Sequence, residues 1–228
     1  MLKKTLKSLF ISKKKNTALL PQGEKGIKKM GHRNYVGGYW DEIGSLQFRF
    51  LLKNGLRPED IFLDIACGSL RAGVHLIPYL NKGNYLGMDK EKNLIKLGLE
   101  KELEQKWIQL KEPTFVVSAN FKFQKFEKKP NFAIAQSLFT HLPSSLIHTC
   151  FRNLREHFDE NGLFFATYFI SPTRTINPKE AHSHGIFHYT IEEAKNFGIA
   201  NGWDVDVIGD WGHPRNQQIF KYTPKKSE

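Results

Sequence analysis

Acidic and small residues next to two predicted strands are the first positions at which this sequence could do chemistry. The turn Asp64–Ser69 reads Asp-Ile-Ala-Cys-Gly-Ser and directly follows a short apolar run, while Asp89 closes the next apolar run. Small side chains in such a turn let the backbone approach a ligand closely. A carboxylate at the end of the following strand can accept two hydrogen bonds from a ribose diol. These residues predict a nucleoside-binding turn; the alternative is a tight turn with an incidental aspartate.

Two histidines are candidates for proton transfer. His141 follows a predicted strand and directly precedes a helix that opens at Pro143, and His213 lies beside Asp210, which could orient its imidazole. Histidine suits a general base because its ordinary pKa is near neutrality. The alternatives are that His141 caps the helix or satisfies a buried carbonyl, and that Asp210 and His213 only stabilise their turn.

A third group of histidines, His182, His184 and His188, lies in a long loop where an acceptor would enter. No carboxylate cluster accompanies them, and their spacing is not diagnostic of metal binding. We expect no metal site.

Short apolar runs of strand type alternate with helical patterns along the chain. The predicted strands are Ile61–Ile65, Tyr85–Met88, Phe115–Ser118, Phe132–Ala135 and Leu163–Ile170, followed by an antiparallel pair, Trp203–Ile208 and Gln217–Tyr222. The predicted helices are Ile43–Leu52, Leu70 to about Leu80, Asp89 to about Trp107, and the helix opening at Pro143. This alternation predicts an α/β fold: a Rossmann-like, doubly wound, mostly parallel seven-stranded sheet ending in an antiparallel hairpin. Ligands of such sheets bind beyond the carboxyl ends of the strands.

Four segments resemble the class I methyltransferases that use S-adenosylmethionine. They are Leu63–Ser69, Gly87–Asp89, Ser118–Phe121 and Ala135–Leu142, and the resemblance extends from about Tyr35 to Tyr222. It implies that Ala66, Cys67 and Gly68 face the methionine and ribose of the cofactor. It further implies that Asp89 holds the ribose hydroxyls, that Asn120 lies near the adenine and that Gln136 lies beneath the sulfonium. Asp64 completes the turn motif on the cofactor side.

The turn departs from the family pattern at two glycine positions. Ala66 replaces the first glycine and Leu70 the third, so the turn is no pyrophosphate cradle, which argues against a dinucleotide enzyme. Asn120 stands where an aspartate is commoner. The segment Tyr35–Trp40, with Gly37 and Gly38, is typical of a lid over the cofactor in this family. A packed flap without ligand contact is the alternative.

The acceptor is expected to be a hydroxyl of a small molecule, a sugar, a nucleotide-sugar or a surface-glycan precursor. In the family that the chain resembles, methylation of an adenine amino group usually goes with an Asn/Asp-Pro-Pro-aromatic motif after the fourth strand, and methylation of a cytosine ring uses a cysteine thiolate that often follows a proline. This chain lacks that motif, and neither Cys67 nor Cys150 follows a proline, so the resemblance implies an acceptor other than a nucleic acid. The alternatives are N-methylation of a small amine and a non-catalytic protein that binds S-adenosylmethionine.

The net charge of +11 is concentrated in the two ends of the chain. Between Gly31 and Phe220 there are 22 basic and 21 acidic residues, so no basic groove for a nucleic acid is predicted. We expect a basic arm and linker at 1–30, one domain at 31–222 and a basic tail at 223–228. The arm at 1–15 is either a soluble tail or a weak contact with the inner membrane face, and two cysteines predict a cytoplasmic protein.

Overall fold

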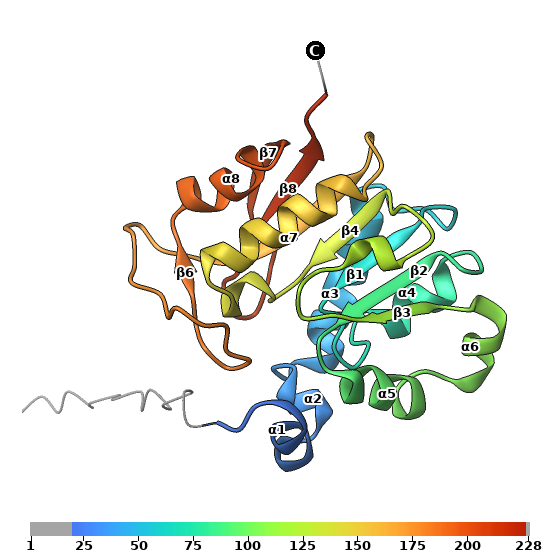
Figure 1. Ribbon diagram of the computed structural model, residues 1–228. Coiled ribbons are helices and arrows are strands. Elements are labelled where there is room, and N and C mark those ends of the chain that lie inside the picture. The colour runs from blue at the N-terminus through green and yellow to red at the C-terminus, as the bar shows by residue number, and fades with distance from the viewer. Residues whose placement is uncertain (1–19, 227–228) are drawn as a thin grey trace, which may run out of the picture.

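Helices cover both faces of a central sheet in the computed structural model, which describes residues 20–226 (Figure 1). The strands are β1 Phe62–Ile65, β2 Tyr85–Asp89, β3 Thr114–Val117, β4 Phe132–Ala135, β5 Leu163–Ile170, β6 His188–Tyr189, β7 Trp203–Asp210 and β8 Gln218–Pro224. The helices are α1 Gly23–Met30, α2 His32–Tyr35, α3 Trp40–Lys53, α4 Gly73–Tyr79, α5 Lys92–Lys101, α6 Gln105–Lys111, α7 Ser144–Glu156 and α8 Ile191–Ile199, with short 3-10 turns η2 Phe123–Lys125 and η3 Phe139–His141.

The strand order is β3-β2-β1-β4-β5-β8-β7, with the short β6 paired to β5 outside that path. Strands β1 to β5 pair in parallel, and β8 runs antiparallel to both β5 and β7. The predicted α/β, doubly wound, mostly parallel sheet with its final hairpin is confirmed. Because the strand order reverses between β1 and β4, a crevice opens at their carboxyl ends.

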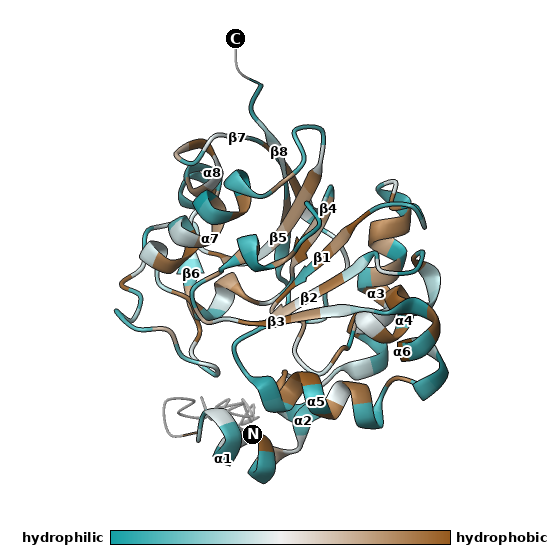
Figure 2. Cartoon of the chain, turned by 45° about the vertical axis from the view of Figure 1, so that its right-hand side comes forward, coloured by the Kyte–Doolittle hydropathy of each residue, from teal (hydrophilic) through white to brown (hydrophobic). Residues whose placement is uncertain are grey.

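Successive side chains of the buried strands point to opposite faces of the sheet and pack in two separate hydrophobic cores. Leu63 of β1 packs in the core under α7, with Ile147 and Phe151. Phe62 points to the opposite face and packs with Leu76 of α4. The central strands β1, β2, β4 and β5 are accordingly mostly buried and apolar, whereas the edge strands β3 and β7 are partly exposed, and the helices carry both hydrophilic and apolar residues (Figure 2). Both core layers hold the strand ends rigidly in place for the site.

Two helix predictions need correction. The helical pattern expected from Asp89 to Trp107 is two helices, α5 and α6, because the chain turns at Glu102, whose carboxylate accepts hydrogen bonds from Arg33 and His32. The helix expected from Leu70 begins only at Gly73, because Leu70 has a left-handed backbone with φ of +69°.

The ends of the folded body also differ from the prediction. Residues 22–31, expected as linker, contain α1, which packs Ile27 against Tyr35 and Leu94. At the other end β8 continues to Pro224, which pairs with Trp203, so the body extends past the predicted boundary at 222.

The predicted arm at 1–15 lies outside the described residues. Within 20–226, the helices are all too short or too polar to cross a membrane.

Candidate functional site

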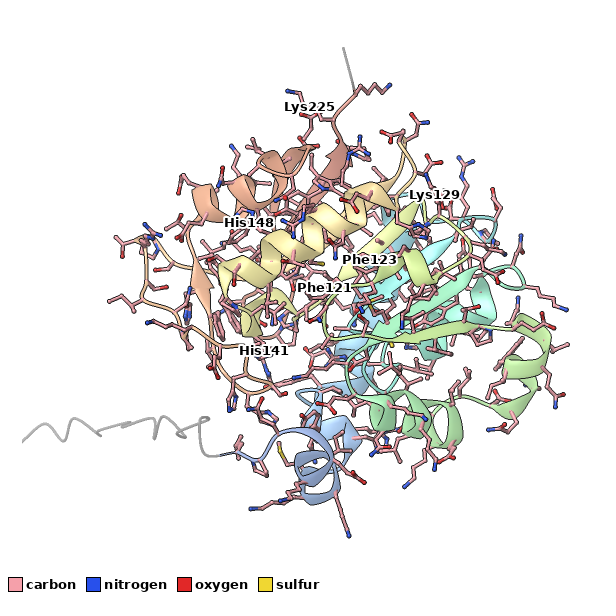
Figure 3. The ribbon with its side chains drawn as sticks, in the orientation of Figure 1. Phe121, Phe123, Lys129, His141, His148 and Lys225 are labelled. Atoms are coloured by element: carbon pink, nitrogen blue, oxygen red, sulfur yellow. The ribbon has the colours of Figure 1, made fainter. Side chains whose placement is uncertain are left out.

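A cavity of about 860 Å³ lies at the carboxyl ends of the parallel strands, where the strand order reverses. This volume is within the usual range for small-molecule sites. Ten of the predicted site residues line it: Tyr35, Asp64, Ala66, Cys67, Gly68, Asp89, Asn120, Gln136, His141 and His213. The predicted Asp210 does not. Figure 3 shows His141 at this end of the molecule, near the N-terminal helices, with Lys225 at the opposite end.

The turn after β1 is held in left-handed backbone conformations. Ala66 has φ of +64°, Gly68 +56° and Leu70 +69°. A left-handed conformation costs an L-residue about 1–2 kcal/mol, and such strain is kept where the surroundings enforce it. At Leu70 the surroundings are the core, in which its side chain is fully buried. At position 68 a residue larger than glycine would also clash, because its Cβ would lie 2.9 Å from Val36 Cγ1.

Asp89 connects the turn to the end of β2. Its Oδ2 accepts a hydrogen bond from the Gly68 N–H at 2.9 Å, and its Oδ1 accepts one from the Glu91 N–H at 2.8 Å. Each oxygen retains a second lone pair, so the carboxylate can still accept hydrogen bonds from a diol. Burial raises its pKa.

Asp64 lies deeper, beneath the turn. Its Oδ2 accepts a hydrogen bond from the Tyr85 hydroxyl at 2.8 Å, and burial raises its pKa to about 7. Its neighbour Cys67 is buried, and burial raises the pKa of the thiol, so this cysteine contributes a small neutral wall to the cavity.

The N-terminal segment and the loop after β5 both contribute residues to the wall of the cavity and contact each other. The Tyr35 ring packs edge-on against His184, with ring centroids 5.0 Å apart, and Gln22 Oε1 accepts a hydrogen bond from the Ser183 N–H. Asn120, in the loop after β3, is exposed at the other side of the cavity. The predicted lid segment is therefore in contact with the cavity.

His141 lines the cavity, and one of its ring nitrogens has a hydrogen-bond partner. Its Nδ1 lies within hydrogen-bond distance of the Gly185 carbonyl oxygen, which can only accept, so Nδ1 carries the proton. The neutral ring then has its lone pair on Nε2, which makes no hydrogen bond within residues 20–226. Burial lowers the pKa of His141 to about 4, below the near-neutral value on which its choice as a base rested, so the ring is neutral at physiological pH but is a weaker base than an ordinary histidine. The carbonyl contact foreseen as an alternative is thus formed by one nitrogen only.

His213 is arranged differently, and the expected pair with Asp210 is not formed. Nε2 of His213 lies 3.0 Å from the Gln136 amide nitrogen, and Nδ1 lies 3.2 Å from the Arg215 backbone nitrogen. Burial, Arg71 and Arg215 lower its pKa to about 4. Asp210 is exposed, and its carboxylate accepts a hydrogen bond from the Gly212 N–H instead, because the turn directs it outward.

Sequence reasoning missed a buried polar network beside these histidines. Arg71 Nη2 donates to Gln136 Oε1 at 2.7 Å, and Gln136 contacts Ser137, whose hydroxyl lies between Gln136 and Gln217. One signal was available: Arg71 is the only Lys, Arg, Asp or Glu between Ile65 and Asn81. A single charge within an apolar segment indicates a buried polar role.

Within residues 20–226, no group of three histidine, cysteine or carboxylate side chains could hold a metal ion. His182 Nδ1 accepts a hydrogen bond from the His184 backbone N–H, and His184 Nε2 lies within hydrogen-bond distance of the Pro21 carbonyl oxygen.

No protein-family model matches the chain. Magnesium protoporphyrin IX methyltransferase (ChlM) from Synechocystis PCC 6803, with bound SAH, is 12% identical, with a TM-score of 0.60 over 90% of this chain and 96% of that chain. An S-adenosylmethionine-dependent methyltransferase from Clostridium acetobutylicum ATCC 824 is 10% identical, with a TM-score of 0.61 over 89% and 98%. The glycopeptide N-methyltransferase MtfA complexed with S-adenosylmethionine is 13% identical, with a TM-score of 0.62 over 79% and 94%. The chain therefore has the class I methyltransferase fold.

Proposed function

We propose that this chain is an S-adenosylmethionine-dependent methyltransferase that acts on a hydroxyl oxygen of a small molecule, with a sugar or nucleotide-sugar as the first class to test. One observation carries the proposal: a single cavity at the switch point of a methyltransferase fold brings Asp89, the Gly68 turn and His141 together. The neighbours that bind S-adenosylmethionine or SAH support it at the level of fold.

The residues at the turn fit the cofactor. Asp89 would accept from the ribose hydroxyls with its remaining lone pairs, and the backbone at Gly68, whose N–H is bonded to Asp89, would lie beside the ribose. Asn120 would lie near the adenine and Gln136 beneath the sulfonium. When bound, S-adenosylmethionine supplies an electrophilic methyl group.

His141 is the base in this proposal. Its Nδ1–H is held by the Gly185 carbonyl, so Nε2 keeps its lone pair and would accept the proton of the hydroxyl. His213 would act as a positioning residue, because it contacts Gln136 with one nitrogen and the Arg215 backbone with the other.

The acceptor side of the cavity is mixed in character. Leu142, Leu146, Phe169 and Ile186 provide apolar surface, while His182 and Ser183 provide polar groups. A ring with one apolar face and peripheral hydroxyls matches that lining.

Calorimetric titration with S-adenosylmethionine and S-adenosylhomocysteine tests the proposal. We expect micromolar binding to the wild type and at least tenfold weaker binding to Asp89→Ala, because the variant loses the diol acceptor and the bond to Gly68. Asp204→Ala, at an exposed aspartate on β7 away from the cavity, is the matched control and should bind like the wild type. Absence of binding to the wild type would overturn the proposal.

A further inference from the structure

Two arginines hold three consecutive carbonyls of the segment between α2 and α3. Arg71 Nη1 donates to the carbonyls of Val36 at 3.2 Å and Gly38 at 2.9 Å, and Arg215 Nη2 donates to the carbonyl of Gly37. The Arg215 guanidinium also lies over the Tyr39 ring, 5.2 Å from its centroid. Both arginines line the cavity, so their guanidinium groups come together at its wall although they are distant in sequence.

The Arg71 charge is buried without an ion-paired carboxylate in the part of the chain that the structure describes. Arg71 is only 8% exposed, and its remaining hydrogen bond goes to the neutral amide oxygen of Gln136. Its Nε–H is buried and has no partner in the described residues. Within residues 20–226 neither Arg71 nor Arg215 forms an ion pair. A buried charge paired only with neutral groups is costly, and a counter-ion relieves that cost.

The described acidic side chains near the cavity form no ion pair with Arg71, and the charge of Asp64, which favours the charged guanidinium, offsets only part of the cost of its burial. Asp64 is bonded to the Tyr85 hydroxyl, and Asp89 to the backbone at Gly68 and Glu91. Burial and the neighbouring Arg215 lower the pKa of Arg71, to about 10, so the guanidinium is still charged at neutral pH. The wall of the cavity at this point is therefore positive.

We propose that Arg71 and Arg215 form a subsite for a carboxylate of a bound ligand. A carboxylate is favoured because one negative charge balances one buried guanidinium, and the planar guanidinium matches a carboxylate geometrically. The inference rests on the proposed function, which offers two sources of the same chemistry: the amino-acid carboxylate of S-adenosylmethionine, or a carboxylate on the methyl acceptor.

A purely structural role makes a different prediction. If the two arginines only fix the Val36–Gly38 segment over Gly68, their loss weakens every ligand of the cavity equally. If they form a carboxylate subsite, their loss weakens only ligands that carry a carboxylate. The test therefore compares pairs of ligands that differ in this one group.

The first arm measures calorimetric affinity for S-adenosylmethionine and for its decarboxylated analogue, which keeps the sulfonium, adenosine and amine. If the cofactor is the source, the wild type binds S-adenosylmethionine at least tenfold more tightly than the analogue. Arg71→Met then removes that difference without weakening the analogue more than about threefold, and Arg71→Lys retains part of it. Arg49→Met, at an exposed arginine of α3, should behave like the wild type.

The second arm uses protein saturated with S-adenosylhomocysteine and titrates it with benzoate and with neutral benzamide. If the acceptor is the source, benzoate binds at least tenfold more tightly, and Arg215→Met and Arg71→Lys reduce this preference. The proposal is overturned if the wild type distinguishes neither pair. If the wild type binds no adenosyl compound, the proposed function fails, and benzoate against benzamide on the protein alone still decides the subsite. Circular dichroism of each variant shows whether it folds. If Arg71→Met does not fold, Arg71→Lys or Arg215→Met replaces it in the comparison.

Discussion

The two candidate bases, His141 and His213, differ in the hydrogen bonding of their ring nitrogens. His141 and His213 both line the cavity, and burial lowers both pKa values to about 4. His141 uses only Nδ1 in a hydrogen bond, whereas the single lone pair of neutral His213 faces an N–H donor in either tautomer, the Gln136 amide at Nε2 or the Arg215 backbone at Nδ1. Chemistry at a hydroxyl needs an available lone pair, so the geometry favours His141.

We expect His141→Ala to lower the rate of methyl transfer by about 100-fold or more, the usual contribution of a general base. The affinity for S-adenosylmethionine should stay within about twofold, because the ring contacts the Gly185 loop and not the Asp89 side of the cavity. Single-turnover rates and calorimetry on the same preparation measure the two effects. His148→Ala, on α7 outside the cavity (Figure 3), is the control. A full rate in His141→Ala would remove it as the base.

At the scale of elements, the strained turn depends on the close approach of α5. A Cβ on Gly98 of α5 would lie 2.6 Å from the Ser69 carbonyl oxygen and 2.7 Å from Leu70 Cγ. Leu70 is buried beneath α5, which can approach this closely because residue 98 is a glycine. The same contact keeps the turn over the Asp89 carboxylate, so packing at α5 is coupled to the shape of the site.

Gly98→Ala should therefore destabilise the fold by roughly 1–3 kcal/mol, the usual cost of overpacking a core. Its affinity for S-adenosylmethionine should also fall, since the turn must shift. Urea unfolding gives the first quantity, with an unchanged m-value expected. Lys96→Ala on the exposed side of the same helix should change neither. An unaltered midpoint in Gly98→Ala would show that α5 can move away without cost.

Across the whole molecule, acid stability depends on opposing buried groups. Burial lowers the pKa of His213 from 6.5 to about 4, so between these values the unfolded chain binds a proton that the folded chain does not. That difference lowers stability as the pH falls from about 6.5 to 4. Asp64 acts in the opposite sense, because its pKa is raised to about 7 and the folded state takes up the proton first.

A variant pair isolates the histidine contribution, since the aspartates are common to both proteins. From pH 7 to pH 5 we expect the wild type to lose about 2 kcal/mol of unfolding free energy relative to His213→Gln. Urea unfolding of both proteins at the two pH values measures this difference. His157→Gln, outside the cavity, should track the wild type. Parallel pH profiles for wild type and His213→Gln would contradict the buried neutral state of His213.

The alternation of strands and helices, the turn at Asp64–Ser69 and the place of Asp89 at the end of a strand are all predictable from the order of the residues. These features are visible because burial of a strand or helix leaves a local pattern of apolar residues, and because the carboxyl ends of parallel strands must meet at one edge. For the same reason ten of the eleven predicted site residues line the cavity.

Contacts between groups that are distant in sequence became visible in the folded chain. The tertiary structure directed Asp210 toward Gly212 and away from His213, and it packed α1 onto the body through Ile27. It also brought Arg71 and Arg215 to neighbouring carbonyls of one segment, Arg71 to those of Val36 and Gly38 and Arg215 to that of Gly37. Such contacts depend on the direction in which a loop leaves its strand and on a few tenths of an ångström in packing. Neither the direction of a loop nor a packing distance can be read from local periodicity. For this reason the meeting of Arg71 and Arg215 at the cavity could not be predicted from the sequence.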